Sequence, residues 1–244
     1  TGSLELLQRR IAQGKIDEVD RYVNAAQGAA HRAASLTHRL LAFARRNTLD
    51  PKPTVINRRA SGMGDLIRRT VGPSIELEIV GAAGLWTTLV DQHQLENALL
   101  NFCINGRDAM PDGGRMTIGT ANRVLDEHAA GELELAPGQY ISLCVTDSGT
   151  GMSPEVMVRA FDPFFTTKPI GMGTGLGLSM VYGFARQSEG RVRIYSEVGK
   201  GTTMCFYLPC PHGAEPCAED AAAAEVPRAE DDQVGVVVDA APAG

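Results

Sequence analysis

The sequence of 244 residues predicts an α+β fold, in which one sheet is layered with helices and a helical hairpin comes first. Apolar residues between positions 17 and 46 recur every three or four residues, which is the spacing of a long amphipathic helix. From about residue 56 onward, helical patterns alternate with short strand patterns. A chain of this length can bury one good core and a smaller appendage.

The first segment, residues 1–49, is predicted to be the helical hairpin. Residues 4–11 also have helical spacing, and the Gln13-Gly14-Lys15 triplet separates them from the longer helix. Asp50 and Pro51 end that helix, and residues 50–57 are predicted to be a linker. The hairpin has an apolar stripe that needs a partner surface, and two such hairpins would make a four-helix bundle.

Residues 58–210 are predicted to be the globular domain. Helical patterns lie at residues 57–70, 91–110, 154–160 and 175–189. Strand patterns lie at residues 75–80, 85–90, 115–121, 140–146, 191–197 and 202–208. Tight turns are expected at residues 111–114, between a helix and a strand, and at 197–201, between the last two strands.

The distribution of charge along the chain narrows the class of protein. The net charge of −6 is concentrated at the end of the chain, where residues 212–244 hold eight acidic residues against Arg228 alone. Residues 211–244 are therefore predicted to be an acidic, alanine- and proline-rich linker without a core. Residues 1–70 hold thirteen basic and six acidic residues, but without interleaved aromatic residues they favour a solvated helix face over a nucleic-acid site.

The five cysteines include no Cys-x-x-Cys pair, so we expect neither a zinc site nor a disulfide framework, and a reducing cytoplasm fits. No run of about 18 apolar residues is present, so no membrane segment is predicted.

Four motifs carry the chemistry. Asn101 and Asn105 are four positions apart and therefore share one face of a helix. Two glycine clusters follow, at 147–151 (Asp-Ser-Gly-Thr-Gly) and at 171–177 (Gly-Met-Gly-Thr-Gly-Leu-Gly), with a phenylalanine-rich segment at 161–168 between them. Together they predict a nucleotide pocket with a mobile lid.

Asp147 ends a predicted strand, where a carboxylate can accept a hydrogen bond from a purine amine while glycines let the base approach the backbone. An aspartate cap at a strand-to-helix turn is the alternative for this motif alone. Magnesium bound mainly by phosphates and water needs only one or two protein oxygens. Asn105 is the predicted magnesium ligand, with Asn101 supporting it or contacting phosphate and Asp108 one turn on.

Glycines that lead into a helix place backbone N–H groups and the positive end of the helix dipole near phosphates. The cluster at 171–177 is therefore predicted to hold the phosphates. Lys168 is predicted to meet a phosphate when the lid closes, and the rings of Phe161, Phe164 and Phe165 either anchor the lid or pack in the core.

In this order the motifs resemble the ATP-binding catalytic domain of bacterial sensor histidine kinases, and the resemblance covers about residues 1–210. It implies a two-layer α/β sandwich of the Bergerat type, a mixed sheet covered by helices on one face, that binds ATP and Mg²⁺. In that family the residue corresponding to Asp147 reads adenine, and Thr202 and Thr203 form the far wall of the base pocket. The implied ATP-binding residues are Asn101, Asn105, Asp108, Asp147, Gly149, Gly151, Phe165, Thr167, Lys168, Gly171, Gly173, Thr174, Gly175, Leu176, Gly177, Leu178, Thr202 and Thr203.

Three features of the sequence bear on the reaction or on the fit to the family pattern. Related ATPases have a glutamate four residues before the magnesium asparagine as general base for water, but this chain has Asn101, which favours phosphoryl transfer over hydrolysis. The family's acceptor-histidine box is absent, since His31 and His38 lack an adjacent carboxylate. Gly106 stands where the family more often has alanine.

The sequence thus predicts the ATP-binding region of a cytoplasmic sensor histidine kinase, whose acceptor histidine is absent from this chain. The resemblance implies a homodimer through the hairpin and a response-regulator receiver domain as partner. The final segment, 234–239, is similar to the first strand of a receiver domain, as in a hybrid kinase, although any buried strand has this pattern. A nucleotide-gated ATPase of the same fold, or a non-catalytic dimerisation and docking module, are the alternatives.

Overall fold

The computed structural model describes residues 49–169 and 173–211. The chain forms two compact units, which we describe separately. One holds the described residues 49–166 and 175–211, and the described residues of the other are 167–169, 173 and 174. The predicted hairpin with His31 and His38, and the acidic segment with the strand pattern at 234–239, lie outside the described residues.

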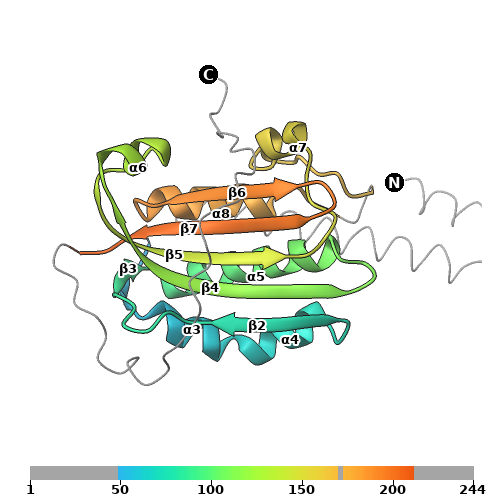
Figure 1. The fold of residues 1–244 in the computed structure, drawn as a ribbon, viewed down its shortest axis with the longest axis horizontal. Helices are drawn as coiled ribbons and strands as arrows, with labels where there is room; N and C mark the ends of the chain where they lie inside the picture. The colour runs from blue at the N-terminus through green and yellow to red at the C-terminus, as the bar shows by residue number, and fades with distance from the viewer. Residues whose placement is uncertain (1–48, 170–172, 212–244) are drawn as a thin grey trace, which may run out of the picture. The chain divides into compact units, whose positions relative to one another are not determined.

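A five-stranded mixed sheet is the centre of the larger unit (Figure 1). Its strand order is β2-β4-β5-β7-β6, with β2 parallel to β4 and the other pairs antiparallel. The strands are β2 (Ile75–Val80), β4 (Gly114–Leu125), β5 (Gly138–Asp147), β6 (Arg191–Glu197) and β7 (Gly201–Pro209). The central pair, β5 and β7, places Asp147 opposite Thr202.

Helices cover one face of this sheet. Figure 1 shows α5 (Gln92–Asp108) and α8 (Gly177–Gln187) behind the strands, and α3 (Ile56–Gly62) and α4 (Gly64–Val71) at the β2 edge. The start of α5 is capped by Asp91, whose side chain accepts a hydrogen bond from the Gln94 amide at 3.1 Å. Alternate strand residues enter the core between the layers, where Phe206 stacks on Phe102 of α5 and meets Phe184 of α8 edge-on. The predicted two-layer fold is therefore confirmed.

The opposite face of the sheet is covered at one end by α6 (Glu127–Glu132). Its Ala130 forms a second apolar cluster with Leu125 and Tyr140. The side chain of Asp126 caps this short helix by accepting a hydrogen bond from the Ala129 amide at 2.8 Å. Cys144 belongs to this same face, because it alternates with the core residues Leu143 and Val145 along β5.

The structure corrects the cysteine prediction. Cys144 of β5 and Cys205 of β7 form a disulfide, with their Cα atoms 4.1 Å apart. The expectation of no disulfide was wrong because spacing along the chain says nothing about residues that strand pairing places directly opposite each other. The free cysteines among the described residues are Cys103, which is buried, and Cys210, which is half-buried.

Most predicted elements are present, with two additions and one break. Within the segment predicted as a linker, β1 (Lys52–Thr54) pairs antiparallel with β3 (Thr88–Val90) as a separate two-stranded sheet. The expected helix at 57–70 is divided at Met63 into α3 and α4. The remaining predicted helix at 154–160 is α7 (Pro154–Arg159), whereas α6 was not predicted.

Candidate functional site

The candidate site is built around Asp147, the last residue of β5. Its side chain is only 4% exposed and faces the helical layer, where it lies against Gly106 of α5. The Gly149 amide donates a hydrogen bond to Oδ1 of Asp147 at 2.9 Å, and the backbone N–H of Thr202 donates to the same carboxylate. Neutral backbone groups on both sides of the carboxylate therefore fix its orientation.

Burial raises the pKa of Asp147 above its ordinary value, because the charged form loses hydration. The hydrogen bonds from Gly149 and Thr202 oppose this effect, since they favour the carboxylate over the acid. A buried carboxylate oriented in this way can accept a hydrogen bond from a ligand.

Close backbone approaches around Asp147 require glycine. At Gly201, φ is +109° and a Cβ atom would lie 1.9 Å from the carbonyl oxygen of Asp147. At Gly151, φ is +68° and a Cβ atom would lie 2.0 Å from the carbonyl oxygen of Glu197. Neither position can hold a side chain without moving the backbone. The glycines thus bring the loop after β5 against the β6–β7 hairpin.

Hydrogen bonds secure this loop to the hairpin. The Met152 amide donates to Oγ of Ser196 at 2.8 Å, and the Gly199 amide donates to the carbonyl oxygen of Thr150 at 2.8 Å. The hydroxyl of Ser196 also lies 2.8 Å from that of Thr202. On the other side, the Thr150 amide donates to the carbonyl oxygen of Ala109 at 3.0 Å, just past the end of α5.

Helix α5 contributes the asparagine face. Nδ2 of Asn101 donates to the carbonyl oxygen of Asn97 at 3.0 Å, and Oδ1 of Asn101 faces Gly177, where a Cβ atom would lie 3.1 Å away. Asn105 is half-buried one turn later on the same helix. Asp108 is paired with the neighbouring guanidinium of Arg107 at 2.6 Å. The amide oxygen of Asn101 thus lies beside the first turn of α8.

The start of α8 has features that suit an anion. Leu176, the N-cap residue, is fully buried and has no side-chain cap hydrogen bond, and Leu178 packs against the core. The preceding Gly175 has φ +64° and accepts a hydrogen bond from the Phe164 amide at 2.9 Å. Backbone N–H groups of the first turn of such a helix favour negatively charged ligands.

The three phenylalanines have different surroundings. Phe161 packs against Tyr182 of α8 with ring centroids 5.4 Å apart, as expected of a ring that anchors the segment to the core. The ring of Phe165 lies under the guanidinium of Arg159, 4.4 Å from its centroid. Phe164 has a positive φ of 68° and is 58% exposed. Core packing thus explains Phe161 but not Phe164.

The structure gathers only part of the predicted set around Asp147. Gly149, Gly151 and Thr202 adjoin it, and the loop after β5 joins the end of α5, which carries the asparagines. Thr203 lies on the opposite face, where its hydroxyl pairs with that of Thr146 at 3.0 Å. Thr167, Lys168, Gly173 and Thr174 belong to the smaller unit, and Gly171 lies outside the described residues, so their roles stay predictions.

Sequence reasoning missed Gly201 and Ser196 and underestimated Gly106. A Cβ atom at Gly106 would lie 3.3 Å from Oδ2 of Asp147 and 2.8 Å from Cε of Met116. The only sequence signal for Gly201 was its place in a turn, because its contact with Asp147 depends on the pairing of β5 with β7.

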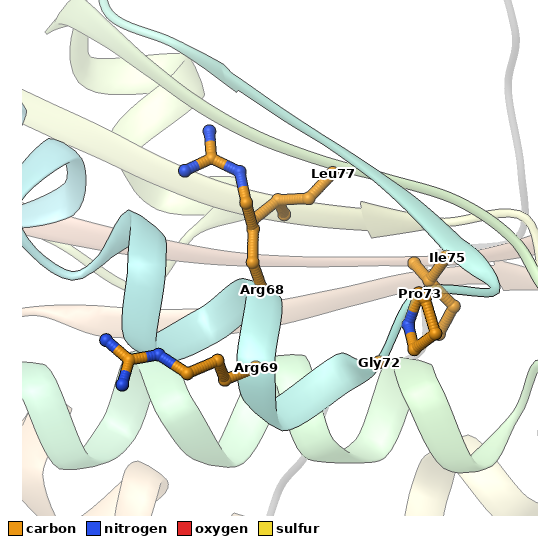
Figure 2. Close-up of a pocket in the computed structure, with 6 residues that line it drawn as sticks. All are labelled: Arg68, Arg69, Gly72, Pro73, Ile75 and Leu77. Atoms are coloured by element: carbon orange, nitrogen blue, oxygen red, sulfur yellow. The ribbon is translucent and has the colours of Figure 1, made fainter.

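A separate cavity of about 400 Å³ lies beside the end of α4 and β2. Two arginines that leave α4 in different directions, Arg68 and Arg69, line it with apolar residues (Figure 2). Since β4 separates β2 from β5, this cavity is not part of the site at Asp147.

Comparison with known proteins agrees with this geometry. The family described as "Histidine kinase-, DNA gyrase B-, and HSP90-like ATPase" matches residues 90–212, from the last residue of β3 to just beyond β7. The chain belongs to this ATPase family. The matched segment contains Asn101, Asn105, Asp147 and both glycine clusters.

Two curated proteins that the chain resembles are named as sensor kinases. Sensor kinase CckA of Brucella abortus (strain 2308) is 44% identical over 181 residues, which are 74% of this chain and 19% of CckA. Sensor histidine kinase ZraS of Escherichia coli (strain K12) is 30% identical over 166 residues, which are 65% of this chain and 32% of ZraS. The chain therefore spans about a fifth to a third of these relatives, and the resemblance to sensor histidine kinases is confirmed.

Among solved structures, full-length ShkA in complex with AMPPNP has a TM-score of 0.64 at 25% identity, covering 82% of this chain and 40% of ShkA. The mycobacterial sensor histidine kinase MprB has a TM-score of 0.53 at 25% identity, covering 68% of this chain and 99% of that structure. None of the helices in residues 49–169 and 173–211 is both long and apolar enough to span a membrane.

Proposed function

We propose that this chain is the ATP-binding catalytic region of a two-component sensor histidine kinase, which transfers the γ-phosphoryl group of ATP to a histidine outside this chain. The observation that carries the proposal is the buried Asp147 carboxylate, held by two backbone N–H groups beside a glycine loop. The relation to CckA and to the AMPPNP complex of ShkA supports it.

Asp147 accepts a hydrogen bond from the purine amine, and its backbone donors keep the acceptor oxygen oriented toward the base. Gly149 and Gly151 keep side chains out of the loop beside the base, since their Cβ atoms would meet Ala109 and Glu197. Thr202 holds the carboxylate from the β7 side. The nucleobase is thus recognised by one charged acceptor in a desolvated setting.

The phosphates lie toward the start of α8, where Gly175 packs closely against the Phe164 backbone and the helix dipole is positive. Asn105 holds magnesium, and Asn101, whose Oδ1 faces Gly177, supports the phosphates. The residues fit a hard cation, because side-chain amide oxygens are suitable ligands for it. Magnesium, when bound, neutralises phosphate charge as the γ-phosphoryl group leaves. On the family resemblance alone, we also propose Thr167, Lys168, Gly171, Gly173 and Thr174 as ATP-binding residues.

Asn101 is central to the choice of reaction. A water-activating base is required for rapid hydrolysis, and a neutral amide at this position cannot take a proton from water. Phosphoryl transfer to a protein side chain needs positioning and charge stabilisation instead.

A sensor histidine kinase of this kind implies two partners in the cytoplasm. One is a second copy of the chain, docked through the hairpin at 1–49, and the other is a response-regulator receiver domain.

The test follows acid-labile protein phosphate after addition of γ-labelled ATP and magnesium. The chain is assayed alone, with a separate polypeptide that carries a family acceptor helix, and with the same polypeptide after its histidine is replaced by glutamine. We expect label only on the polypeptide that keeps its histidine. The Asp147→Asn variant serves as the nucleotide-binding control.

Other outcomes would change the assignment. Label on the chain alone would identify an acceptor such as His31 or His38 and contradict the proposed division of roles. Steady release of phosphate without any labelled histidine would favour an ATPase clamp. Binding to a receiver domain that does not depend on ATP, without any label, would favour a docking module.

A further inference from the structure

The disulfide between Cys144 and Cys205 lies in the central strand pair of the sheet. Its two cysteines are directly opposite each other on β5 and β7, which lie side by side in Figure 1. The Cα separation of 4.1 Å fits a narrow, non-hydrogen-bonded antiparallel pair. No role in the proposed reaction uses this bond, since it lies on the face of the sheet opposite to Asp147 and α5.

The two cysteines differ in exposure. Cys205 is 4% exposed, whereas Cys144 is half-buried, so a small thiol reaches Cys144 more readily. Along β5, the core side chains of Leu143 and Val145 point to the helical layer and Cys144 points away from it. The free thiol of Cys103 is buried in the core with the helical layer, and burial raises its pKa to about 12, which keeps it protonated. Since Cys205 and Cys103 are both buried, thiol–disulfide exchange with a small thiol should begin at Cys144.

The bond is coupled to the nucleotide site through the register of β5 and β7. Three positions along these strands from Cys144 and Cys205, Asp147 is paired with Thr202. The backbone N–H of Thr202 holds the Asp147 carboxylate, and Gly201 is packed against the Asp147 carbonyl. A cross-link that fixes β5 against β7 therefore also limits the motion of the acceptor that reads the base.

We propose that Cys144 and Cys205 form a reversible thiol–disulfide exchange site whose oxidised state keeps Asp147 and Thr202 in their binding arrangement, so that reduction weakens nucleotide binding. The coupling rests on the proposed function of Asp147. The exchange partners are low-molecular-weight thiols and their disulfides, and glutathione is a suitable probe of this class.

The reaction balances in two exchanges. A glutathione thiolate attacks Sγ of Cys144, the bond between the two cysteines breaks, and Cys205 leaves as a thiolate that takes a proton from solvent. A second glutathione thiolate attacks the glutathione sulfur of the mixed disulfide and releases Cys144. The sum is one protein disulfide and two glutathione thiols giving two protein thiols and one glutathione disulfide, and the reverse reaction uses glutathione disulfide as the oxidant.

The experiment equilibrates the chain in buffers of varied ratio of reduced to oxidised glutathione. Protein thiols are counted by alkylation and mass spectrometry, and Mg-AMPPNP affinity and Tm are measured at each ratio. We expect the two thiols to appear and disappear together, the Kd to rise at least threefold on reduction, and Tm to fall by roughly 5–15 °C, because the cross-link closes a loop with a sequence separation of 61.

Two variants sharpen the test. Cys144→Ala/Cys205→Ala should bind like the reduced chain at every ratio, whereas Cys210→Ala, which removes a free thiol at the end of β7, should respond like the unaltered chain. The titration of the unaltered chain decides the matter even where the double variant does not fold. Equal Kd values in both redox states, or no disulfide under oxidising ratios, would overturn this proposal. Absence of nucleotide binding in either state would instead overturn the proposed function, and the coupling with it.

Discussion

Replacing Asp147 with asparagine keeps the shape of the side chain but removes its charge and turns one acceptor oxygen into an NH₂ donor. The Gly149 amide can still donate to the remaining oxygen, as it does to Oδ1 at 2.9 Å in the structure. The new NH₂ group then faces either the Thr202 N–H or the purine amine, and both of these are donors. The substitution therefore leaves two donors facing each other and removes the negative charge that strengthens the hydrogen bond from the base.

The size of the effect follows from the charge and the burial. A hydrogen bond to a charged group contributes about 1.5–3 kcal/mol, which corresponds to roughly a 10- to 150-fold increase in Kd. Folding should not suffer to the same extent, because burial raises the pKa of Asp147 and a neutral amide is easier to desolvate than a carboxylate. The variant should thus fold and yet bind nucleotide roughly 10- to 150-fold more weakly.

The assay is calorimetric titration with Mg-AMPPNP, accompanied by urea unfolding. The matched control is Asp112→Asn, which removes the same charge from an exposed turn before β4. Inosine triphosphate, which has an oxygen in place of the amine, should bind the unaltered chain more weakly than ATP does. This difference should disappear in the Asp147→Asn variant. An unchanged Kd for the adenine nucleotide, with the variant folded, would refute the reasoning.

Three further predictions address the rest of the site. Asn105→Ala should weaken nucleotide binding in magnesium while leaving binding in EDTA unchanged, and an unaltered magnesium response in calorimetry would exclude it as a ligand. Gly201→Ala should lower the free energy of unfolding by more than about 3 kcal/mol, and Gly199→Ala by only about 1–2 kcal/mol, because both have positive φ but only Gly201 also meets backbone. Urea unfolding of the two variants measures this difference, and equal losses would contradict it. As the pH is lowered, nucleotide affinity should begin to fall at a higher pH than the ordinary Asp pKa of 3.8 implies. The reason is that Asp147 must be charged to accept the hydrogen bond from the base and its pKa is raised. Because its pKa is raised on folding, Asp147 binds a proton more tightly in the folded state than in the unfolded state. Its contribution to the free energy of unfolding is therefore largest below pH 3.8 and is lost as the pH rises through the raised pKa. Calorimetry and urea unfolding at varied pH test both signs, with Asp147→Asn as the reference that should show neither trend.

Sequence periodicity located the long elements of the fold because each one buries a regular apolar stripe. Helix α5 and strands β2 and β6 match their predicted ranges closely. Strand β1 could not be predicted in this way, because its three residues adopt an extended conformation through pairing with β3, which lies about 35 residues later in the chain. Helix α6 is too short for a helical period and depends on the Asp126 cap and on packing against Tyr140.

For the site, local motifs predicted which residues carry chemistry but not how the strands bring them together. Asp147 ends β5 as expected. That Thr202 holds its carboxylate, that Thr203 faces the other way, and that Cys144 meets Cys205 all follow from a single register between β5 and β7. Register is a non-local property of the sheet, and one residue of slip would reverse all three results.

The most direct measurement of the central claim is a crystal structure of this chain with AMPPNP and magnesium. The account predicts the adenine amine within about 2.7–3.2 Å of an Asp147 carboxylate oxygen, and magnesium about 2.0–2.1 Å from Oδ1 of Asn105. The phosphates should lie at the start of α8. A nucleotide bound elsewhere, such as in the cavity beside Arg68, or an adenine amine without contact to Asp147, would contradict it.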